Sequence, residues 1–202
     1  MSTGRLADLT LDAFTLALAA KEPVPGGGAA SACLLAQAAA LGSMVIEYSV
    51  DKPKFAVHRS RLEHLAQFLG QARSEALDLA DRDASAYCAL NAMWKIPAAE
   101  RATRADWQST VTEAIAAPSA IADLAMGVLA ALGSMSSITS AQLASDLNIA
   151  KRFAHTALEC ALLNVEVNLP ALSEGTARAA GERFLDSRRR EGATLLRLPR
   201  EG

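Results

Sequence analysis

An alanine-rich apolar run, Ala29–Val50, constrains the fold of this chain more than any other feature. Its residues favour helix, and Gln37 and Glu47 are among its few strongly polar members. A helix that is apolar on nearly all sides is normally buried among other helices. The run is long enough to cross a bilayer, but its alanines, Gln37 and Glu47 make it a weak membrane span. We therefore expect a central core helix over residues 29–48.

The remainder of the chain also has helical periodicity, and no stretch alternates in the manner of a β-strand. Prolines and polar breaks divide it into segments. The segment 55–94 predicts either one helix of about 60 Å or two helices that meet near Gly70. Pro118 is expected to kink or restart the fourth helix. The sequence thus predicts an all-α, elongated bundle of about six helices in one domain, residues 1–202. Residues 1–8 and 193–202 are expected to be loose ends, and Thr10 is the expected N-cap of the first helix. The expected helices are 10–20, 29–48, 55–94, 105–132, 141–169 and 173–190.

The composition limits both the core and the partners. Hydrophobic residues make up 51% of the chain but aromatic residues only 4%, so the core must consist of small and aliphatic side chains on closely approaching helices. A net charge of −2 gives no strong field for nucleic acid, and scattered basic residues argue against a membrane-surface helix. An all-apolar central helix needs more cover than one short bundle supplies, which favours a C2 homodimer.

Cysteine and histidine usage excludes the common metal motifs. Cys33, Cys88 and Cys160 lie far apart in apolar, helix-like stretches, which is typical of small buried side chains in a reducing compartment. The three histidines form no paired or HExxH pattern, so no metal site is expected. The first eight residues lack the layout of a secretion leader, and a cytoplasmic protein is expected.

Three consecutive glycines, Gly26, Gly27 and Gly28, follow Pro25 at the start of the apolar run. Glycine allows positive φ and lets a ligand approach the backbone without meeting a Cβ. Free N–H groups and the positive end of the helix dipole would point outward there, which suits an anion. The alternative is that the glycines only permit a tight turn and close helix packing.

Ordered sequence blocks resemble one known family over about residues 8–190. The chain resembles the formiminotetrahydrofolate cyclodeaminase / methenyltetrahydrofolate cyclohydrolase family in the glycine turn with its small-residue helix and in four later blocks. Each block is modest alone, and their order and spacing make the resemblance specific; the blocks are Val24–Val45, Asp83–Tyr87, Lys95–Pro97, Ser145–Ala150 and Asn164–Leu169.

The resemblance implies a tetrahydrofolate that carries a one-carbon group. Such enzymes hydrolyse 5,10-methenyltetrahydrofolate to 10-formyltetrahydrofolate, or cyclise 5-formiminotetrahydrofolate with release of ammonia. Both reactions act on a carbon that nitrogen already makes electrophilic, so they need positioning and proton transfer rather than a metal or a redox cofactor. The size of the chain resembles the free-standing cyclohydrolase, with the cyclodeaminase as a close second. The family resemblance also implies a homodimer.

Asp83 is the first candidate for proton transfer. Tyr87 follows it by four residues and so shares its helix face, while small neighbours leave room for a ligand. A carboxylate in a half-apolar pocket has a raised pKa and can act as general acid or base. The alternative is a surface aspartate in an acid-rich segment, since Asp78 and Asp81 are near.

Three further polar residues fall within the later blocks. Asp146 stands near the start of a helical run, where it either caps the helix or binds the pterin and orients a water. Asn164 and Asn168 are i and i+4 among apolar residues, so each amide needs a partner. That partner is either a neighbouring helix or the donor and acceptor edge of a pterin.

The turn after the apolar run carries Lys52 and Lys54, which could meet the glutamate carboxylates of a folate or form an ordinary solvated turn. Here the chain departs from the family. Glu47 and Asp51 place negative charge where the family has amide and glycine, and Thr139–Ser140 replaces an expected Gly-Asn pair. Glu47 could supply a new base, and it could equally repel an anionic tail. The alternative function is therefore a diverged, non-catalytic helical dimer with lost or changed ligand binding.

Overall fold

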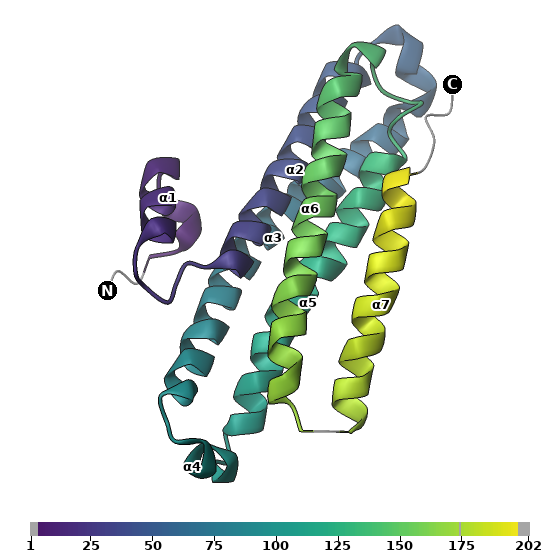
Figure 1. Ribbon diagram of the computed structural model, residues 1–202. Helices are drawn as coiled ribbons and strands as arrows, with labels where there is room; N and C mark the ends of the chain where they lie inside the picture. The colour runs from purple at the N-terminus through teal and green to yellow at the C-terminus, as the bar shows by residue number, and fades with distance from the viewer. Residues whose placement is uncertain (1–3, 174, 198–202) are drawn as a thin grey trace.

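The chain folds as a rod of antiparallel helices (Figure 1). The computed structural model describes residues 4–173 and 175–197. Within these residues seven α-helices and four short 3-10 turns follow one another without a strand, as an all-α fold predicts; the helices are α1 (Leu11–Ala19), α2 (Gly27–Val50), α3 (Arg59–Trp94), α4 (Ala98–Thr103), α5 (Trp107–Gly133), α6 (Ala144–Asn168) and α7 (Thr176–Arg197). The 3-10 turns are η1 (Leu6–Asp8), η2 (Pro53–His58), η3 (Ala141–Leu143) and η4 (Leu169–Ala171).

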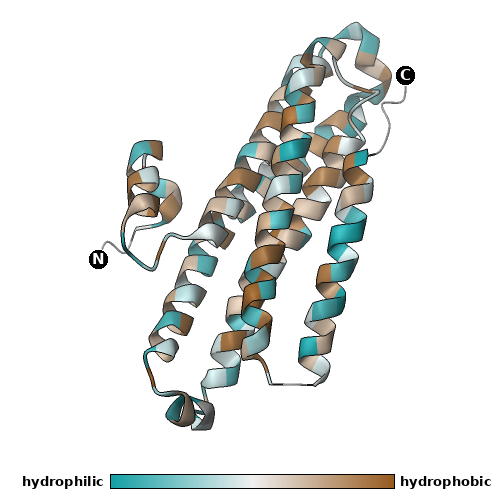
Figure 2. Cartoon of the chain, in the orientation of Figure 1, coloured by the Kyte–Doolittle hydropathy of each residue, from teal (hydrophilic) through white to brown (hydrophobic). Residues whose placement is uncertain are grey.

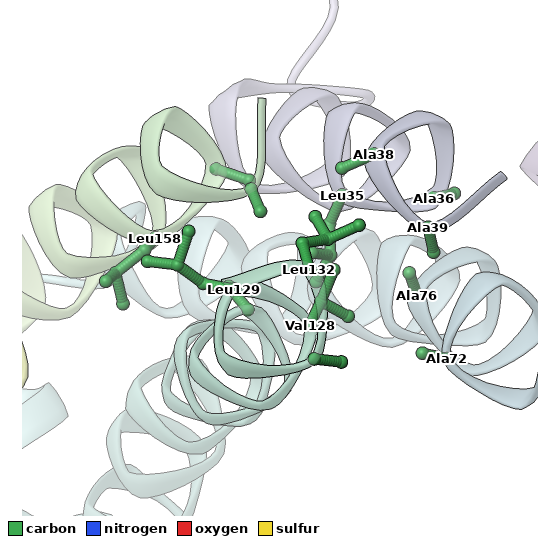
Figure 3. Packing of buried hydrophobic residues seen from close by; sticks show 14 of the residues in the cluster. Leu35, Ala36, Ala38, Ala39, Ala72, Ala76, Val128, Leu129, Leu132 and Leu158 are labelled. Carbon is green, nitrogen blue, oxygen red and sulfur yellow. The ribbon is translucent and has the colours of Figure 1, made fainter. Parts of the chain in front are cut away.

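Helix α2 is buried along the sides that face its neighbours, while Gln37, Ala40, Glu47 and Tyr48 on its outward side are exposed. It packs along α3 on one side and α6 on the other, and α5 completes the four-helix body. In Figure 3 the side chain of Ala39 faces Ala76 of α3, while Leu35 lies toward Leu132 of α5. All four of these residues are fully buried. Alanines at the contact let the helix axes approach closely, which explains how a core with few aromatic residues is filled.

Two helices are long and apolar enough to cross a bilayer by length and composition alone. They are α2 and α5, and 56% and 50% of their most apolar windows are buried inside the bundle. Burial of this extent is what the core helices of a helical bundle show.

Several helix boundaries differ from the sequence-based expectations. The segment after η2 is a single helix of 36 residues, about 54 Å long, and Gly70 does not interrupt it. Helix α2 begins at Gly27 rather than at Ala29, so two of the three glycines lie inside its first turn. An additional short helix, α4, joins α3 to α5. Thr10 caps α1 as expected, because its Oγ1 accepts the backbone N–H of Ala13 at 3.1 Å.

The expectation of loose ends is wrong for the described parts of both ends. Residues 5–8 pack on α3, where the Arg5 guanidinium pairs with Asp78 and the Leu6 backbone N–H donates to Asp81 Oδ1 at 2.7 Å. Residues 193–197 continue α7. Both segments are held by polar contacts and packing that sequence periodicity does not reveal. Residues 1–3 and 198–202 lie outside the described residues.

Pro118 does not break α5, contrary to the expected kink or restart. Proline has no N–H to donate to the carbonyl four residues earlier, which is that of Ala114. The side chain of Asn168 on α6 fills this place, since its Nδ2 donates to the Ala114 carbonyl oxygen at 2.9 Å. The helix therefore stays continuous because a neighbouring helix supplies the missing donor.

This arrangement predicts coupling between Asn168 and Pro118. Asn168→Ala leaves a buried carbonyl without its donor, and we expect a loss of about 1–3 kcal/mol in the free energy of unfolding. In a Pro118→Ala background the restored N–H can bond to Ala114, so the same substitution should cost clearly less. Urea unfolding of the four proteins of the double-mutant cycle measures the difference. Equal costs in both backgrounds would contradict the interaction.

Candidate functional site

A pocket of about 430 Å³ lies where the N-terminus of α2 meets the later half of α3 and the C-terminal end of α6. Its volume falls within the range of small-molecule sites, roughly 300–1,000 Å³. Its lining combines backbone, amide, aromatic and carboxylate groups, and the residues are Pro23, Val24, Gly26, Gly27, Gly28, Asp83, Tyr87, Trp94, Ala114, Asn164, Val167 and Asn168.

Seven of the predicted site residues come together here, from three separate parts of the sequence. They are the three glycines, Asp83, Tyr87, Asn164 and Asn168. The grouping follows from the antiparallel arrangement, because the start of α2, the later half of α3 and the end of α6 lie at one level of the rod. Acid–base, hydrogen-bonding and aromatic groups thus share one cavity.

The backbone of Gly28 leaves the space that the Asp83 carboxylate occupies. A Cβ built on Gly28 would overlap the Asp83 carboxylate, whereas one built on Gly27 would meet only Asn164, at 3.6 Å. The glycines do not serve to reach positive φ, since among the described residues only Gly175 has a positive φ. Gly28 is required because the carboxylate lies directly against its backbone.

The environment of Asp83 shifts its protonation. Desolvation by burial raises the pKa of its carboxyl from 3.8 to about 6, and the hydrogen bond from the Ala29 backbone N–H opposes this shift. Ala29 lies in the first turn of α2, where the helix dipole also favours a negative charge. The positive end of α2 is therefore directed at a carboxyl group of the protein itself.

The sequence left open whether Asn164 and Asn168 bond to helices of the protein or to a ligand. Asn168 is buried and bonds across to α5. Asn164 is half-buried, and its Nδ2 donates to the Cys160 carbonyl of its own helix at 3.0 Å. Both side chains also line the pocket. A structural partner and access to a ligand therefore coexist at these positions.

Trp94 belongs to the pocket but was missed in the sequence. Its ring meets that of Tyr87 edge to face, with centroids 6.0 Å apart, and the two rings are 41% and 37% exposed. The spacing of seven residues puts both on the face of α3 that carries Asp83, and this spacing could have identified it. Pro23, Val24 and Val167 had no comparable pattern in the sequence.

Four predicted site residues lie at the opposite end of the rod. Glu47 and Asp146 are about 30 Å along their helices from Gly27 and Asn164, respectively. Lys52 and Lys54 follow the end of α2. Within one chain these four residues do not reach the glycine turn, because α2 and α6 run the length of the rod without interruption.

At the end of the rod opposite the pocket, polar residues form a separate network. Lys52 Nζ donates to Ser140 Oγ at 3.1 Å, and the Ser140 backbone N–H donates to Ser49 Oγ at 3.0 Å. Lys54 lies over the Phe55 ring, 5.5 Å from its centroid. Asp51, one of the departures from the family, pairs with Arg59 at 2.8 Å. These contacts place the departures outside the pocket of their own chain.

No group of three histidine, cysteine, aspartate or glutamate side chains that could hold a metal ion occurs within residues 4–173 and 175–197. The pocket lining contains one carboxylate and no lysine or arginine. The chemistry that its side chains can perform is proton transfer at Asp83 together with hydrogen bonding and ring contact.

The close contact at Gly28 predicts opposite outcomes for two adjacent substitutions. Gly28→Ala should force Asp83 out of its position and lower the free energy of unfolding by about 1–3 kcal/mol. Gly27→Ala should be neutral or slightly stabilising, because alanine favours helix and its Cβ has room. Chemical denaturation followed by circular dichroism tests both, and an equally destabilised Gly27→Ala would argue against the contact.

The raised pKa of Asp83 predicts a pH-dependent stability. The folded state binds a proton at this carboxyl more tightly than the unfolded chain, so the stabilisation it gives is present at pH 4 and is lost as the pH rises through about 6. The free energy of unfolding of the wild type minus that of Asp83→Asn should fall by up to about 3 kcal/mol between pH 4 and pH 7. Urea titrations at a series of pH values measure this difference, and a difference that does not change with pH would contradict the prediction.

Known proteins resemble this chain in sequence and in fold. A family model described as formiminotransferase-cyclodeaminase matches residues 10–185. The chain is 27% identical to rat (Rattus norvegicus) formimidoyltransferase-cyclodeaminase over 96% of its own length and 36% of the length of that protein. It therefore spans about a third of the length of this relative. It is also 28% identical to methenyltetrahydrofolate cyclohydrolase of Methylorubrum extorquens, over 82% of this chain and 81% of that protein.

A solved structure shares the fold. The crystal structure of formiminotetrahydrofolate cyclodeaminase from Thermotoga maritima superposes with a TM-score of 0.87, covering 95% of this chain and 93% of that chain at 24% identity. The bundle described above is thus the same fold as in that protein.

Proposed function

Because the chain belongs to the formiminotransferase-cyclodeaminase family, we propose that it is an enzyme acting on a one-carbon derivative of tetrahydrofolate. The observation that carries the proposal is the half-buried Asp83 carboxylate, which lines one pocket with Asn164 and Asn168. The alternative of a non-catalytic dimer is not favoured, since the pocket is open and contains a single carboxylate.

The pocket suits a flat, polar ring system. Tyr87 and Trp94 offer aromatic surface on α3, and Asn164 and Asn168 offer amide groups from α6. A pterin ring presents alternating donors and acceptors, which amides can match. In this arrangement the aromatic pair and the amides hold the ring, and Asp83 faces the reacting carbon.

Hydrolysis of 5,10-methenyltetrahydrofolate requires one group that first accepts a proton and later donates it. Water attacks the bridging carbon while the Asp83 carboxylate takes a proton from it. The hydroxyl group of the adduct then loses its proton as the bond from this carbon to N5 breaks, and N5 takes the proton that Asp83 had accepted. The formyl group remains on N10, and one proton is released in total. A carboxyl with a pKa of about 6 can accept and return a proton near neutral pH.

Cyclisation of 5-formiminotetrahydrofolate uses the same groups. N10 attacks the carbon of the protonated formimino group and loses its proton to Asp83. The bond from this carbon to the amino nitrogen then breaks, Asp83 returns the proton to that nitrogen, and ammonia leaves the 5,10-methenyl bridge behind. We rank hydrolysis first, because the cyclohydrolase of Methylorubrum extorquens is matched over 81% of its length. Neither reaction changes the oxidation state of the carbon, so the proposal includes no redox cofactor or metal.

We further propose that the enzyme works in the cytoplasm as a homodimer. Cys33, Cys88 and Cys160 are all free thiols, which suits a reducing compartment. Exposed aliphatic residues on α1 and α6, among them Leu11, Leu16 and Leu163, support association through helix faces.

Activity and its pH dependence test the proposal. Purified protein should accelerate the loss of the 5,10-methenyltetrahydrofolate absorbance above the buffer rate. The value of kcat/KM should rise with pH through about 6 and then level off, because the base form of Asp83 is required. Asp83→Asn should lower kcat by about 10²–10⁴-fold.

The matched control is Glu75→Gln, an exposed carboxylate on the same helix outside the pocket. It should keep the wild-type rate. If the methenyl compound is not consumed, the formimino compound is the next substrate to test. A protein that neither binds nor converts any reduced folate would overturn the proposal.

A further inference from the structure

The amide N–H groups of both pocket asparagines are used by the protein. Asn168 Nδ2 donates to the Ala114 carbonyl oxygen at 2.9 Å, and Asn164 Nδ2 donates to that of Cys160 at 3.0 Å. A carbonyl oxygen only accepts hydrogen bonds, so the amide nitrogen and not the amide oxygen must face it. Each asparagine therefore keeps its acceptor, Oδ1, for another partner.

The Oδ1 atom of Asn168 is accessible from the pocket. The residue lines the cavity although it is only 7% exposed, and no described residue donates a hydrogen bond to its Oδ1. Within the described part of the chain, the only enclosed side-chain nitrogen or oxygen atom without a partner is His155 Nε2. Asn168 Oδ1 is therefore not enclosed. Once a ligand displaces water, this oxygen needs a donor from the ligand, because a buried acceptor left unpaired is costly.

Pro118 fixes the direction of this amide from outside the pocket. It is buried in α5 and is not among the residues that line the cavity. It leaves the Ala114 carbonyl without the N–H that another helix residue would donate, and the nitrogen of Asn168 is thereby held toward α5. The Cys160 carbonyl, in contrast, is positioned to accept the backbone N–H of Asn164, as in any helix. Of the two amides, only that of Asn168 is held by a missing backbone donor.

Asn168 lies one helical turn beyond the groups at the start of α2. Asp83 lies against Gly28, and the amide oxygen of Asn164 lies 3.6 Å from the Cβ position of Gly27. Asn168 follows Asn164 by four residues, about 6 Å further along α6. The last turns of α6 are mainly hydrophobic (Figure 2). The pocket therefore offers a carboxyl group and, one turn away, a fixed acceptor in apolar surroundings.

The pterin of a tetrahydrofolate has a donor at the matching place. N5, which bears the reacting carbon, and the amino group on C2 stand at opposite ends of the ring system, a span comparable with one helical turn. The glutamate carboxylates of a folate only accept hydrogen bonds, so they are poor partners for an amide oxygen. With the reacting carbon at Asp83, the C2 amino group is thus the donor at the level of Asn168.

We propose that Asn168 selects the substrate by accepting a hydrogen bond from the C2 amino group of the pterin, and that Pro118 is the positioning residue that turns the Asn168 oxygen toward it. The identity of the ligand rests on the proposed function, whereas the orientation of the amide rests only on the contact with Ala114. A site with a fixed acceptor rejects an analogue that lacks the donor, because the buried oxygen then stays unpaired.

Binding of two unreactive ligands tests the selection. Tetrahydrofolate carries no one-carbon group and so is not converted, and its analogue with a 2-oxo group has an acceptor in place of the amino donor. Calorimetric titration under anaerobic conditions should show that the wild type binds the analogue about 10–100-fold more weakly. Equal affinities would overturn this inference alone, whereas a wild type that binds no reduced folate would overturn the proposed function as well.

Pro118→Ala tests the positioning role without a change in the pocket lining. The introduced N–H bonds to Ala114 and releases the Asn168 amide, so the affinity ratio between the two ligands should fall severalfold while circular dichroism shows an unchanged helix content. The matched control is Ser119→Ala, which removes the neighbouring bond from Ser119 Oγ to the Ile115 carbonyl at 2.8 Å but gives Ala114 no donor. This control should keep the wild-type ratio. A Pro118→Ala protein with the full ratio would refute the role of Pro118.

A rescue separates hydrogen bonding from packing. In the Pro118→Ala background, Asn168→Asp at pH 8 replaces the released amide by a carboxylate, which only accepts. The preference for tetrahydrofolate over the 2-oxo analogue should then return to about 10-fold or more. Asn168→Leu in the same background keeps a similar volume without an acceptor, and it should show no preference. A carboxylate variant without any preference would refute the hydrogen bond to the amino group.

Discussion

The close approach of Gly28 to Asp83 is the contact on which the site depends. It brings the first turn of α2 against the later half of α3, with the carboxylate lying on the glycine backbone where a Cβ would overlap it. The same approach excludes water from the carboxyl group and directs the Ala29 N–H toward it. Desolvation outweighs that hydrogen bond, and the pKa rises to about 6. Helix packing and proton chemistry therefore have one physical origin.

A second contact ties the opposite wall of the pocket to the fold. Pro118 leaves the Ala114 carbonyl without its helical donor, and Asn168 supplies one from α6. An asparagine that would otherwise be a mobile ligand contact is thereby held in one orientation, with its Nδ2 committed to the fold. The pocket is thus bounded by side chains whose positions are fixed by backbone requirements of their neighbours, which is the kind of preorganisation that catalysis needs.

The sequence predicted the fold well because helical periodicity and prolines are local properties. It placed the start of α2 two residues late, since the glycines were expected to form the turn before the helix, whereas Gly27 and Gly28 lie in its first turn. It predicted continuity at Gly70 only as one of two options, and it could not show that Asn168 compensates for Pro118, because that contact joins residues 54 positions apart.

The candidate site was predicted only in part, because here too the sequence gives no contacts between residues far apart in the chain. The resemblance gives motifs in order but gives no distances, so Asp83 and Asn168 were grouped together with Lys52 and Asp146. The length of α2 alone, 24 residues, separates its two ends by about 36 Å. Trp94 was missed although its spacing of seven residues from Tyr87 places it on the face of α3 that carries Asp83.

The rod shape also separates charged groups of the molecule. Helix α2 runs without interruption from the glycines to the turn that carries Lys52, so it holds this lysine about 36 Å from the pocket of its own chain. The pocket lining accordingly contains Asp83 but no lysine or arginine. A lysine beside Asp83 would favour the ionised carboxylate and lower its pKa, so the length of α2 preserves the raised pKa that the proposed chemistry uses.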